Sequence, residues 1–146
     1  MNRTSRLTRT AQVALAVVLA VVLTACLSGG QQSVADEMNA DRRENGRRTL
    51  ATHDALNRKA QAWAEKLARD NALSHSTLSS GLPSCWRGVG ENVGFGSSIP
   101  AVQAAYMKSP GHRKNILDTT WDFVGVGSAT RGSRVFTVQV FMRGCR

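Results

Sequence analysis

The chain has 146 residues, of which 42% are hydrophobic and 20% are charged, so it is long enough for one globular domain and too short for two. Its formal net charge of +9 falls to +6 when the three arginines before residue 26 are set aside, because 16 basic and 10 acidic residues remain. These charges are scattered, and no recognition helix, zinc finger or aromatic-basic RNA motif accompanies them, which argues against nucleic acid as a partner. A modest positive charge instead suits anionic lipid headgroups or wall polymers.

The N-terminal segment reads as an export signal. Three arginines in the first nine residues precede an apolar run over residues 13 to 23, which is short for a membrane span. The run ends in "LTAC", which resembles the bacterial lipobox, whose cysteine is diacylated and becomes the mature N-terminus. We therefore predict a lipoprotein signal peptide over residues 1–25 and lipidation of Cys26. An uncleaved anchor and an ordinary cleavage site nearer Ala35 are the alternatives, and each of them also exports the domain.

Three cysteines in an exported chain leave one unpaired unless another modification uses it. Lipidation of Cys26 would leave Cys85 and Cys145, and we predict that these two form a disulfide in an oxidising compartment. Two free, buried cysteines are the alternative. Residues 26–32 are polar after the cysteine and read as a tether that reaches about 20 to 25 Å when extended. Residues 33–146 then form a single domain close to the membrane.

The first half of that domain reads as helical. Ser33 is the expected N-cap of a first helix, acidic residues follow in its first turn, and Gly46 is expected to end it. A second amphipathic helix is indicated by apolar residues at helical spacing, namely Leu56, Ala60, Trp63, Ala64 and Leu67. His53, just before this helix, is expected at the surface. A serine-rich loop over residues 71 to 86 follows and contains His75.

The next segment, "GVGENVGFG" over residues 88 to 96, alternates glycines with larger residues and predicts a strand. Glu91 shares a face with apolar neighbours along this strand. A carboxylate in such a place is costly unless it is paired or hydrogen-bonded, so Glu91 needs a cationic or hydrogen-bond-donating partner.

Two further helices and a hairpin complete the chain. Ser98 and Pro100 predict the start of a third helix, and Ser109-Pro110 predicts a short fourth one with serine as its N-cap. His112 then lies in a first helical turn, where the helix dipole disfavours the imidazolium and leaves a neutral, ligand-ready imidazole. Residues 123 to 129 and 135 to 142 read as an antiparallel hairpin. Both of its faces carry apolar residues, which predicts helices on each side of the sheet.

By spacing alone, a shared site of His75, Glu91 and His112 is only one interpretation, and three unrelated, separately satisfied side chains are the other. No H-E-x-x-H, C-x-x-C or G-x-S-x-G motif assigns a reaction. Longer signatures are more specific. In chain order they are "MNADRRENGRRTL" at 38 to 50, "SHS" at 74 to 76, "GEN" at 90 to 92, "SPGHRKNIL" at 109 to 117 and "FVGVG" at 123 to 127. This ordered set resembles the CAP superfamily of cysteine-rich secretory, antigen 5 and pathogenesis-related proteins, in its short bacterial SCP-like branch.

The resemblance covers nearly everything from residue 33 to residue 145. It implies an α+β fold, a three-layer α-β-α sandwich with a small, largely antiparallel sheet. It also implies a cavity lined by two histidines and acidic residues, which fall here on His75, Glu91 and His112. Many relatives carry a second glutamate on the helix before the last histidine, but residues 105 to 109 read "AYMKS" and contain no carboxylate.

Two neutral imidazoles and a carboxylate are a reasonable ligand set for zinc or another divalent first-row metal, with a position left for water. In the alternative, Glu91 orders the histidines by hydrogen bonding and the cluster shapes a cavity without chemistry. We expect an exported lipoprotein of the bacterial cell envelope, anchored by lipid to the outer face of the cell membrane. Its role is then that of a binding module whose ligand is a lipid, a wall polymer or a protein. The competing hypothesis is a metal-assisted hydrolase acting on an envelope polymer or peptide.

Overall fold

A computed structural model of the protein describes residues 26–145, so the predicted signal peptide, residues 1–25, lies outside the described residues, as does Arg146. The described chain contains four helices and four strands. In order they are α1 (Gly29–Glu44), β1 (Ala51–Thr52), α2 (Asp54–Asp70), β2 (Trp86–Gly96), α3 (Ile99–Lys108), α4 (Pro110–Leu117), β3 (Phe123–Arg131) and β4 (Arg134–Gly144).

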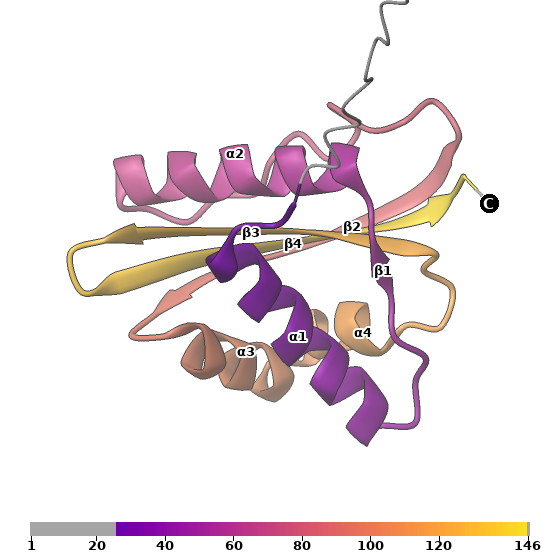
Figure 1. Ribbon diagram of the computed structural model, residues 1–146, viewed down its shortest axis with the longest axis horizontal. Coiled ribbons are helices and arrows are strands. Elements are labelled where there is room, and N and C mark those ends of the chain that lie inside the picture. The colour runs from indigo at the N-terminus through magenta and orange to yellow at the C-terminus, as the bar shows by residue number, and fades with distance from the viewer. Residues whose placement is uncertain (1–25, 146) are drawn as a thin grey trace, which may run out of the picture.

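The strands form one mixed sheet in the order β1-β3-β4-β2. β1 runs parallel to β3, whereas the β3–β4 and β4–β2 pairs are antiparallel. Helix α2 covers one face of the sheet, and α1, α3 and α4 cover the other (Figure 1). The predicted α+β sandwich of three layers, with a largely antiparallel sheet, is therefore confirmed.

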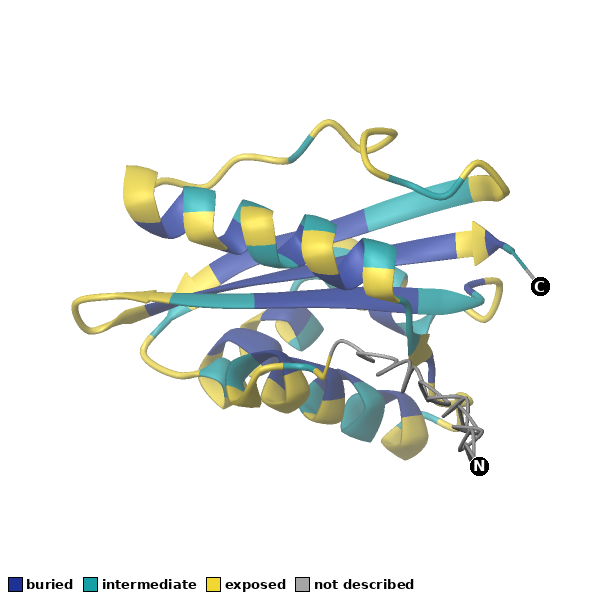
Figure 2. Ribbon diagram, turned by 45° about the horizontal axis from the view of Figure 1, so that its top comes forward, coloured by how far each residue is buried: buried dark blue, intermediate teal, exposed yellow. Residues whose placement is uncertain are grey.

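The residue alternation of β4 explains why both faces are covered. Phe136, Val138 and Val140 are buried in the core cluster under α2. Val135 and Phe141 point the other way and belong to the cluster formed with α1, α3 and α4. A strand with apolar side chains on both faces is stable only between two layers. β4 accordingly lies in the middle of the sheet and is buried along most of its length (Figure 2).

Two glycines of the "FVGVG" signature let α2 approach β3 at backbone distance. A Cβ atom on Gly125 would lie 2.2 Å from the carbonyl carbon of Leu56, and one on Gly127 would lie 2.2 Å from the carbonyl oxygen of Ala60. Such distances are far below van der Waals contact, so only glycine fits at either position. This signature therefore encodes packing between a helix and a strand.

β1 is too short to pair with all of β3, and side chains from the helices form hydrogen bonds with the backbone groups of β3 that β1 leaves unpaired. Asn57 Oδ1 accepts the Val126 N–H at 3.1 Å, and Gln61 Oε1 accepts the Ser128 N–H at 3.0 Å. From the other layer, Gln31 Nε2 donates to the Val126 carbonyl at 2.8 Å. These amides protect an edge that would otherwise be open to strand pairing.

The start of α1 differs from the prediction. The helix begins at Gly29 with Ser28 as its N-cap, not at Ser33, and no acidic residue lies in its first turn. Ser28 Oγ accepts the Gln31 N–H at 3.3 Å, and Gln31 Oε1 accepts the Ser28 N–H at 3.1 Å, which forms a capping box. Residues 29–32 of the expected tether are therefore helical, and Leu27 before them packs against the core. What is left of the tether is residues 26–28.

The other helix starts agree better with the sequence. Ser98 caps α3 as predicted, and its side chain accepts the Ala101 N–H. Ser109 occupies the N-cap position of α4, but its side chain makes no capping hydrogen bond. His53 has a role that the sequence did not suggest. It is the N-cap of α2, where its Nδ1 accepts the Ala55 N–H at 3.2 Å.

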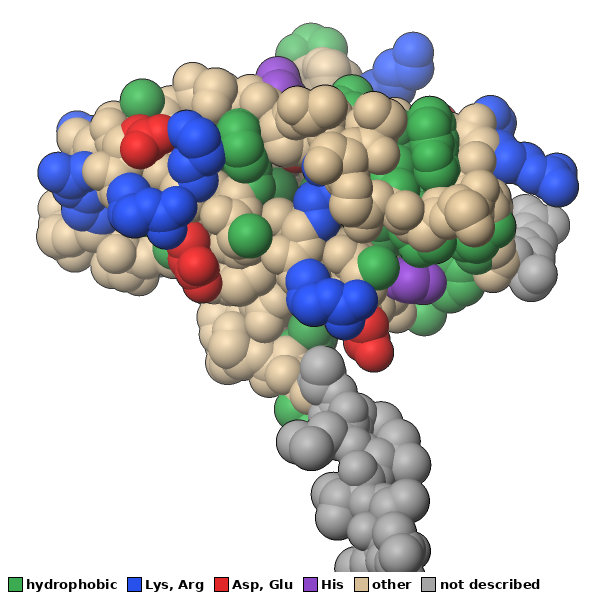
Figure 3. Space-filling model, turned by 90° about the horizontal axis from the view of Figure 1, so that it is seen from above, with side chains coloured by type: hydrophobic (Ala, Val, Ile, Leu, Met, Phe, Trp, Pro, Cys, Tyr) green, Lys and Arg blue, Asp and Glu red, His purple; other side chains and the backbone are tan. Residues whose placement is uncertain are grey.

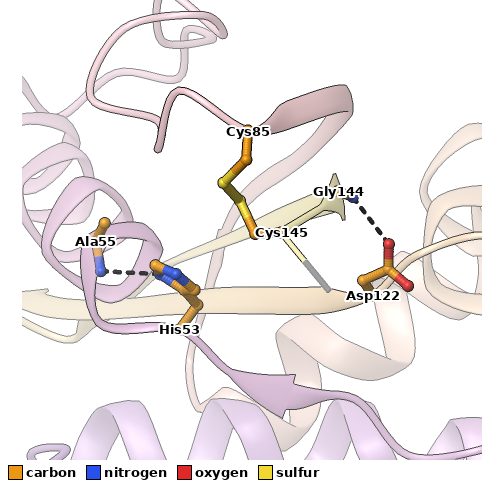
Figure 4. Close-up of a disulfide and its surroundings, with 6 residues drawn as sticks. All are labelled: His53, Ala55, Cys85, Asp122, Gly144 and Cys145. Atoms are coloured by element: carbon orange, nitrogen blue, oxygen red, sulfur yellow. Dashed lines mark hydrogen bonds between the residues drawn. A yellow bond between two sulfur atoms is a disulfide. The ribbon is translucent and has the colours of Figure 1, made fainter.

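The predicted disulfide between Cys85 and Cys145 is confirmed, with 5.1 Å between the two Cα atoms. It joins the residue before β2 to the residue after β4 across 60 positions of sequence (Figure 4). Cys26 is exposed and is free among the described residues. No helix in the described part of the chain is both long and apolar enough to span a bilayer.

The surface over α2 carries lysine and arginine side chains at several separate places (Figure 3). They do not gather into one continuous stripe on this face. This distribution agrees with the scattered charges of the sequence and differs from the concentrated basic surface of nucleic-acid-binding domains.

Candidate functional site

Glu91 lies in the middle of β2, the edge strand of the sheet. In the β2–β4 register it stands opposite Val140, so its side chain points to the α2 face, while Asn92 stands opposite Gln139 on the other face. The side chain of Glu91 is only 1% exposed. Its burial beside apolar residues is what the alternation of β2 predicted, and it makes hydrogen-bond partners necessary.

The partners of Glu91 all come from the loop between α2 and β2. His75 Nδ1 lies 2.8 Å from Glu91 Oε1, and the Ser76 N–H donates to the same oxygen at 2.9 Å. The Ser76 hydroxyl donates to Oε2 at 2.6 Å. Three donors therefore satisfy both oxygens of the buried carboxylate, so the expected partner of Glu91 is the "SHS" segment of the loop.

This arrangement orients the ring of His75. A carboxylate can only accept at Nδ1, so Nδ1 carries a proton and Nε2 is the ring nitrogen that Glu91 does not engage. The His75 side chain is 60% exposed, whereas its partner Glu91 is buried. The structure thus presents an imidazole that is held by Glu91 on one side and is accessible from solvent.

His112 is the third residue of α4 and packs against Tyr106 of α3, with the two ring centroids 4.9 Å apart. Desolvation lowers the pKa of His112, and charge repulsion from His75 lowers it further. The prediction of a neutral imidazole is thus supported by burial more than by the helix dipole. The effect of His75 on this pKa also shows that the two histidines lie within electrostatic range of each other.

Buried amides hold α4 in place beneath β2. Asn92 Nδ2 donates to the His112 carbonyl at 3.2 Å, and Asn115 Nδ2 donates to Asn92 Oδ1 at 3.0 Å. Asn92 also donates to Gln139 at 3.1 Å, and Gln139 donates to Gln103 at 2.7 Å. The asparagine of the "GEN" signature therefore links the backbone at His112 to the centre of the sheet. Sequence reasoning missed this role.

Arg42 of α1 is a second residue that the sequence analysis missed. It is fully buried, and its Nη1 donates to the carbonyls of Ile116 and Asp118 at the end of α4. Its Nε donates to the Arg48 carbonyl at 2.8 Å. Burial lowers the pKa of Arg42. The guanidinium connects three segments, and it fixes the end of α4 opposite to His112.

These observations refine the predicted ligand set. Both oxygens of Glu91 are occupied by His75 and Ser76, and no group of three His, Cys, Asp or Glu side chains among residues 26–145 has the arrangement of a metal site. The groups offered to a ligand are the two imidazoles, with Glu91 behind one of them. This geometry is that of the alternative in which the glutamate orders a histidine by hydrogen bonding.

The model of the cysteine-rich secretory protein family, CAP, matches residues 35–141. The chain belongs to this family. Among curated proteins, the uncharacterized protein YkwD of Bacillus subtilis is 30% identical in an alignment over 116 residues that covers 73% of this chain. The CAP chain described here spans 45% of the length of YkwD.

Solved structures show the same fold. An outer surface protein of Borrelia burgdorferi has a TM-score of 0.67 and 19% identity, with 78% of this chain and 92% of that chain covered. An extracellular protein containing an SCP domain, from Bacillus anthracis, has a TM-score of 0.67 and 25% identity, with 79% of this chain and 40% of that chain covered. This CAP domain is therefore similar to domains of bacterial extracellular and surface proteins.

Proposed function

We propose that this CAP domain is a binding module of the bacterial cell envelope, exported and anchored to the outer face of the cell membrane by a lipid on Cys26. The lipobox-like "LTAC" sequence, the disulfide and the extracellular relatives support export. Cys26 itself is exposed and lies shortly before the first helix, so a lipid attached to its sulfur would not disturb the core.

The observation that carries the binding role is the hydrogen bond between His75 and buried Glu91. A carboxylate behind an imidazole fixes its tautomer and raises its basicity as a ligand, which is the usual outer-shell arrangement of metal-binding histidines. His75 Nε2 and the neutral ring of His112 are the groups that would hold a divalent ion such as zinc. A bound zinc ion would leave positions open for water or for a polar group of an envelope ligand.

No observation favours the hydrolase over the binding module. The hydroxyl of Ser76, the residue after His75, donates to Glu91 Oε2. Its proton is therefore directed to a carboxylate and not to an imidazole that would act as its base. Metal-dependent turnover of an envelope polymer or peptide by the zinc-loaded protein would reverse this preference.

Zinc titration by calorimetry at pH 7.5 tests the proposal. We expect one zinc ion per chain, loss of binding in both His75→Ala and His112→Ala, and weakening by about 10- to 100-fold in Glu91→Gln. His53→Asn is the matched control, because it removes the remaining histidine while asparagine retains an N-cap for α2. Absence of zinc binding, or stoichiometric binding that survives both alanine variants, would refute the metal role.

A further inference from the structure

A pocket lies at the end of the sheet beside the disulfide. Its walls are the first residues of β2, the last residues of β4 and the disulfide itself, and it has a volume of about 810 Å³. Pockets that hold small molecules fall in the range of about 300 to 1,000 Å³. Trp86 in its wall is five residues before Glu91, roughly 17 Å along an extended strand. The pocket is thus separate from the histidines.

Irregular backbone at both strand ends shapes this pocket. The register between β2 and β4 shifts between Trp86 and Gly88, so Arg87 is the extra residue of a bulge. Gly144 opposite has a φ of +118°, and a Cβ atom there would lie 2.3 Å from the Cys85 carbonyl oxygen. Only glycine fits there, and bulges commonly re-aim side chains beside binding sites. The sequence therefore specifies the shape of this strand end.

Two guanidinium groups face the pocket. Arg143 lies over Gly88, and its Nη2 is 3.4 Å from the Arg87 carbonyl oxygen to which it donates. Both arginines are exposed, and neither takes part in the ion pairs found among the described residues. Arg143 also lies within electrostatic range of Asp118, whose pKa it helps to lower.

The pocket also contains an acidic residue, Asp122. Its side chain is only 7% exposed and lies 3.9 Å from Arg48. It also accepts the Gly144 N–H at 2.8 Å, as Figure 4 shows beside the disulfide. Its carboxylate is thus engaged by neighbouring donors, and the charged lining of the pocket consists of two arginines and this one aspartate.

A large apolar side chain, Trp86, lines the same pocket as the two arginines. Trp86 is 37% exposed, which makes it one of the few large exposed hydrophobic side chains of the described chain. Tryptophan and arginine are enriched where proteins bind their partners. Guanidinium groups bind carboxylate and phosphate through paired hydrogen bonds, while an indole packs against a ring.

We propose that this pocket binds a small anionic molecule in which a phosphate or carboxylate group is attached to a ring. Arg87 and Arg143 hold the anionic group, and Trp86 packs against the ring. The disulfide forms one wall, so the pocket exists in the oxidised protein. This site is independent of zinc and of the two histidines.

Calorimetry on the full chain in an uncharged detergent tests the proposal with four probes. Phenyl phosphate carries a ring and a phosphate group, and benzoate carries a ring and a carboxylate group. Inorganic phosphate lacks the ring, and phenol lacks the negative charge. We expect one of the two ring-bearing anions to bind saturably, which identifies the preferred anion. Inorganic phosphate should bind more weakly than phenyl phosphate, and phenol should not bind.

Variants locate the binding. Arg87→Gln and Arg143→Gln should each weaken it about tenfold, the effect of losing one charge-assisted hydrogen bond. Arg113→Gln removes the same charge from the exposed surface of α4 and should leave the affinity unchanged, with circular dichroism confirming the fold of each variant. The proposal is overturned if neither ring-bearing anion binds, if binding survives the double Arg87 and Arg143 variant, or if Arg113→Gln weakens it equally. It is also overturned if inorganic phosphate binds as tightly as phenyl phosphate.

Discussion

Replacing Gly125 by alanine should push α2 away from β3. The new Cβ atom would lie 2.2 Å from the Leu56 carbonyl carbon, whereas ordinary van der Waals contact begins at 3.4 Å, so the overlap is about 1.2 Å. The obstructing atoms belong to the backbone, and no side-chain rotation relieves the clash. The helix would have to lift, although Leu56 and Ala60 are completely buried beneath it.

The expected loss in the free energy of unfolding follows from this backbone clash. A gap of 0.5 to 1 Å already forfeits a quarter to a half of the dispersion energy between facing atoms, and overpacking of a core costs about 1 to 3 kcal/mol. Because the clash is with backbone, we expect Gly125→Ala to lower the free energy of unfolding by about 3 kcal/mol. That loss is a large part of the free energy of unfolding of a typical domain, which is about 5 to 15 kcal/mol.

Urea denaturation followed by circular dichroism measures this effect. Gly111→Ala is the matched control, because Gly111 lies within α4 and a Cβ atom there meets nothing within 4 Å. Alanine should stabilise that helix by about 0.5 to 1 kcal/mol. Both substitutions restrict the unfolded chain equally, so their difference isolates the clash. A loss below about 1 kcal/mol at Gly125 would refute the close approach of α2 to β3.

Two further predictions concern the disulfide and pH. Reducing Cys85–Cys145 should lower the free energy of unfolding by about 4 kcal/mol, because the bond closes a loop of 60 residues; an unchanged urea midpoint under reductant would contradict this. The pKa of His112 is lowered in the folded protein, so folding favours the neutral ring. The contribution of His112 to the free energy of unfolding is therefore complete above the pKa of the unfolded chain, about 6.5, and is lost as pH falls toward the lower pKa of the folded state. His112→Gln should flatten this part of the stability–pH profile, and coincident profiles would show that His112 does not titrate as described.

The sequence was informative where a pattern was long and local. The apolar spacing of residues 56 to 67 predicted α2, and the alternation of residues 88 to 96 predicted β2, because each periodicity is repeated several times. The predicted start of α1 was wrong because the polar composition after Cys26 indicated a tether and Ser33 was the expected N-cap. The capping box at Ser28 was present in the sequence, but the bond that anchors Gln31 is to Val126, 95 residues away.

In the candidate site, too, local sequence motifs were informative and contacts between distant segments were not predictable. Motifs identified His75, Glu91 and His112, but the function of the glutamate depends on which residues surround it after folding. Only the structure shows that the loop segment after α2 occupies both carboxylate oxygens. Arg42 was equally beyond reach, since its carbonyl acceptors at the end of α4 lie more than 70 positions away.

The early start of α1 has a consequence for how the protein would sit in the envelope. If Cys26 carries the acyl chains, only Leu27 and Ser28 separate them from the first helical turn, a reach of about 7 Å. Leu27 is itself packed against the protein interior. Such a short, packed linkage would leave the domain little freedom to move relative to the acyl chains. The domain would then keep one orientation above the bilayer and meet molecules that arrive within the headgroup layer, instead of sampling the space beyond it.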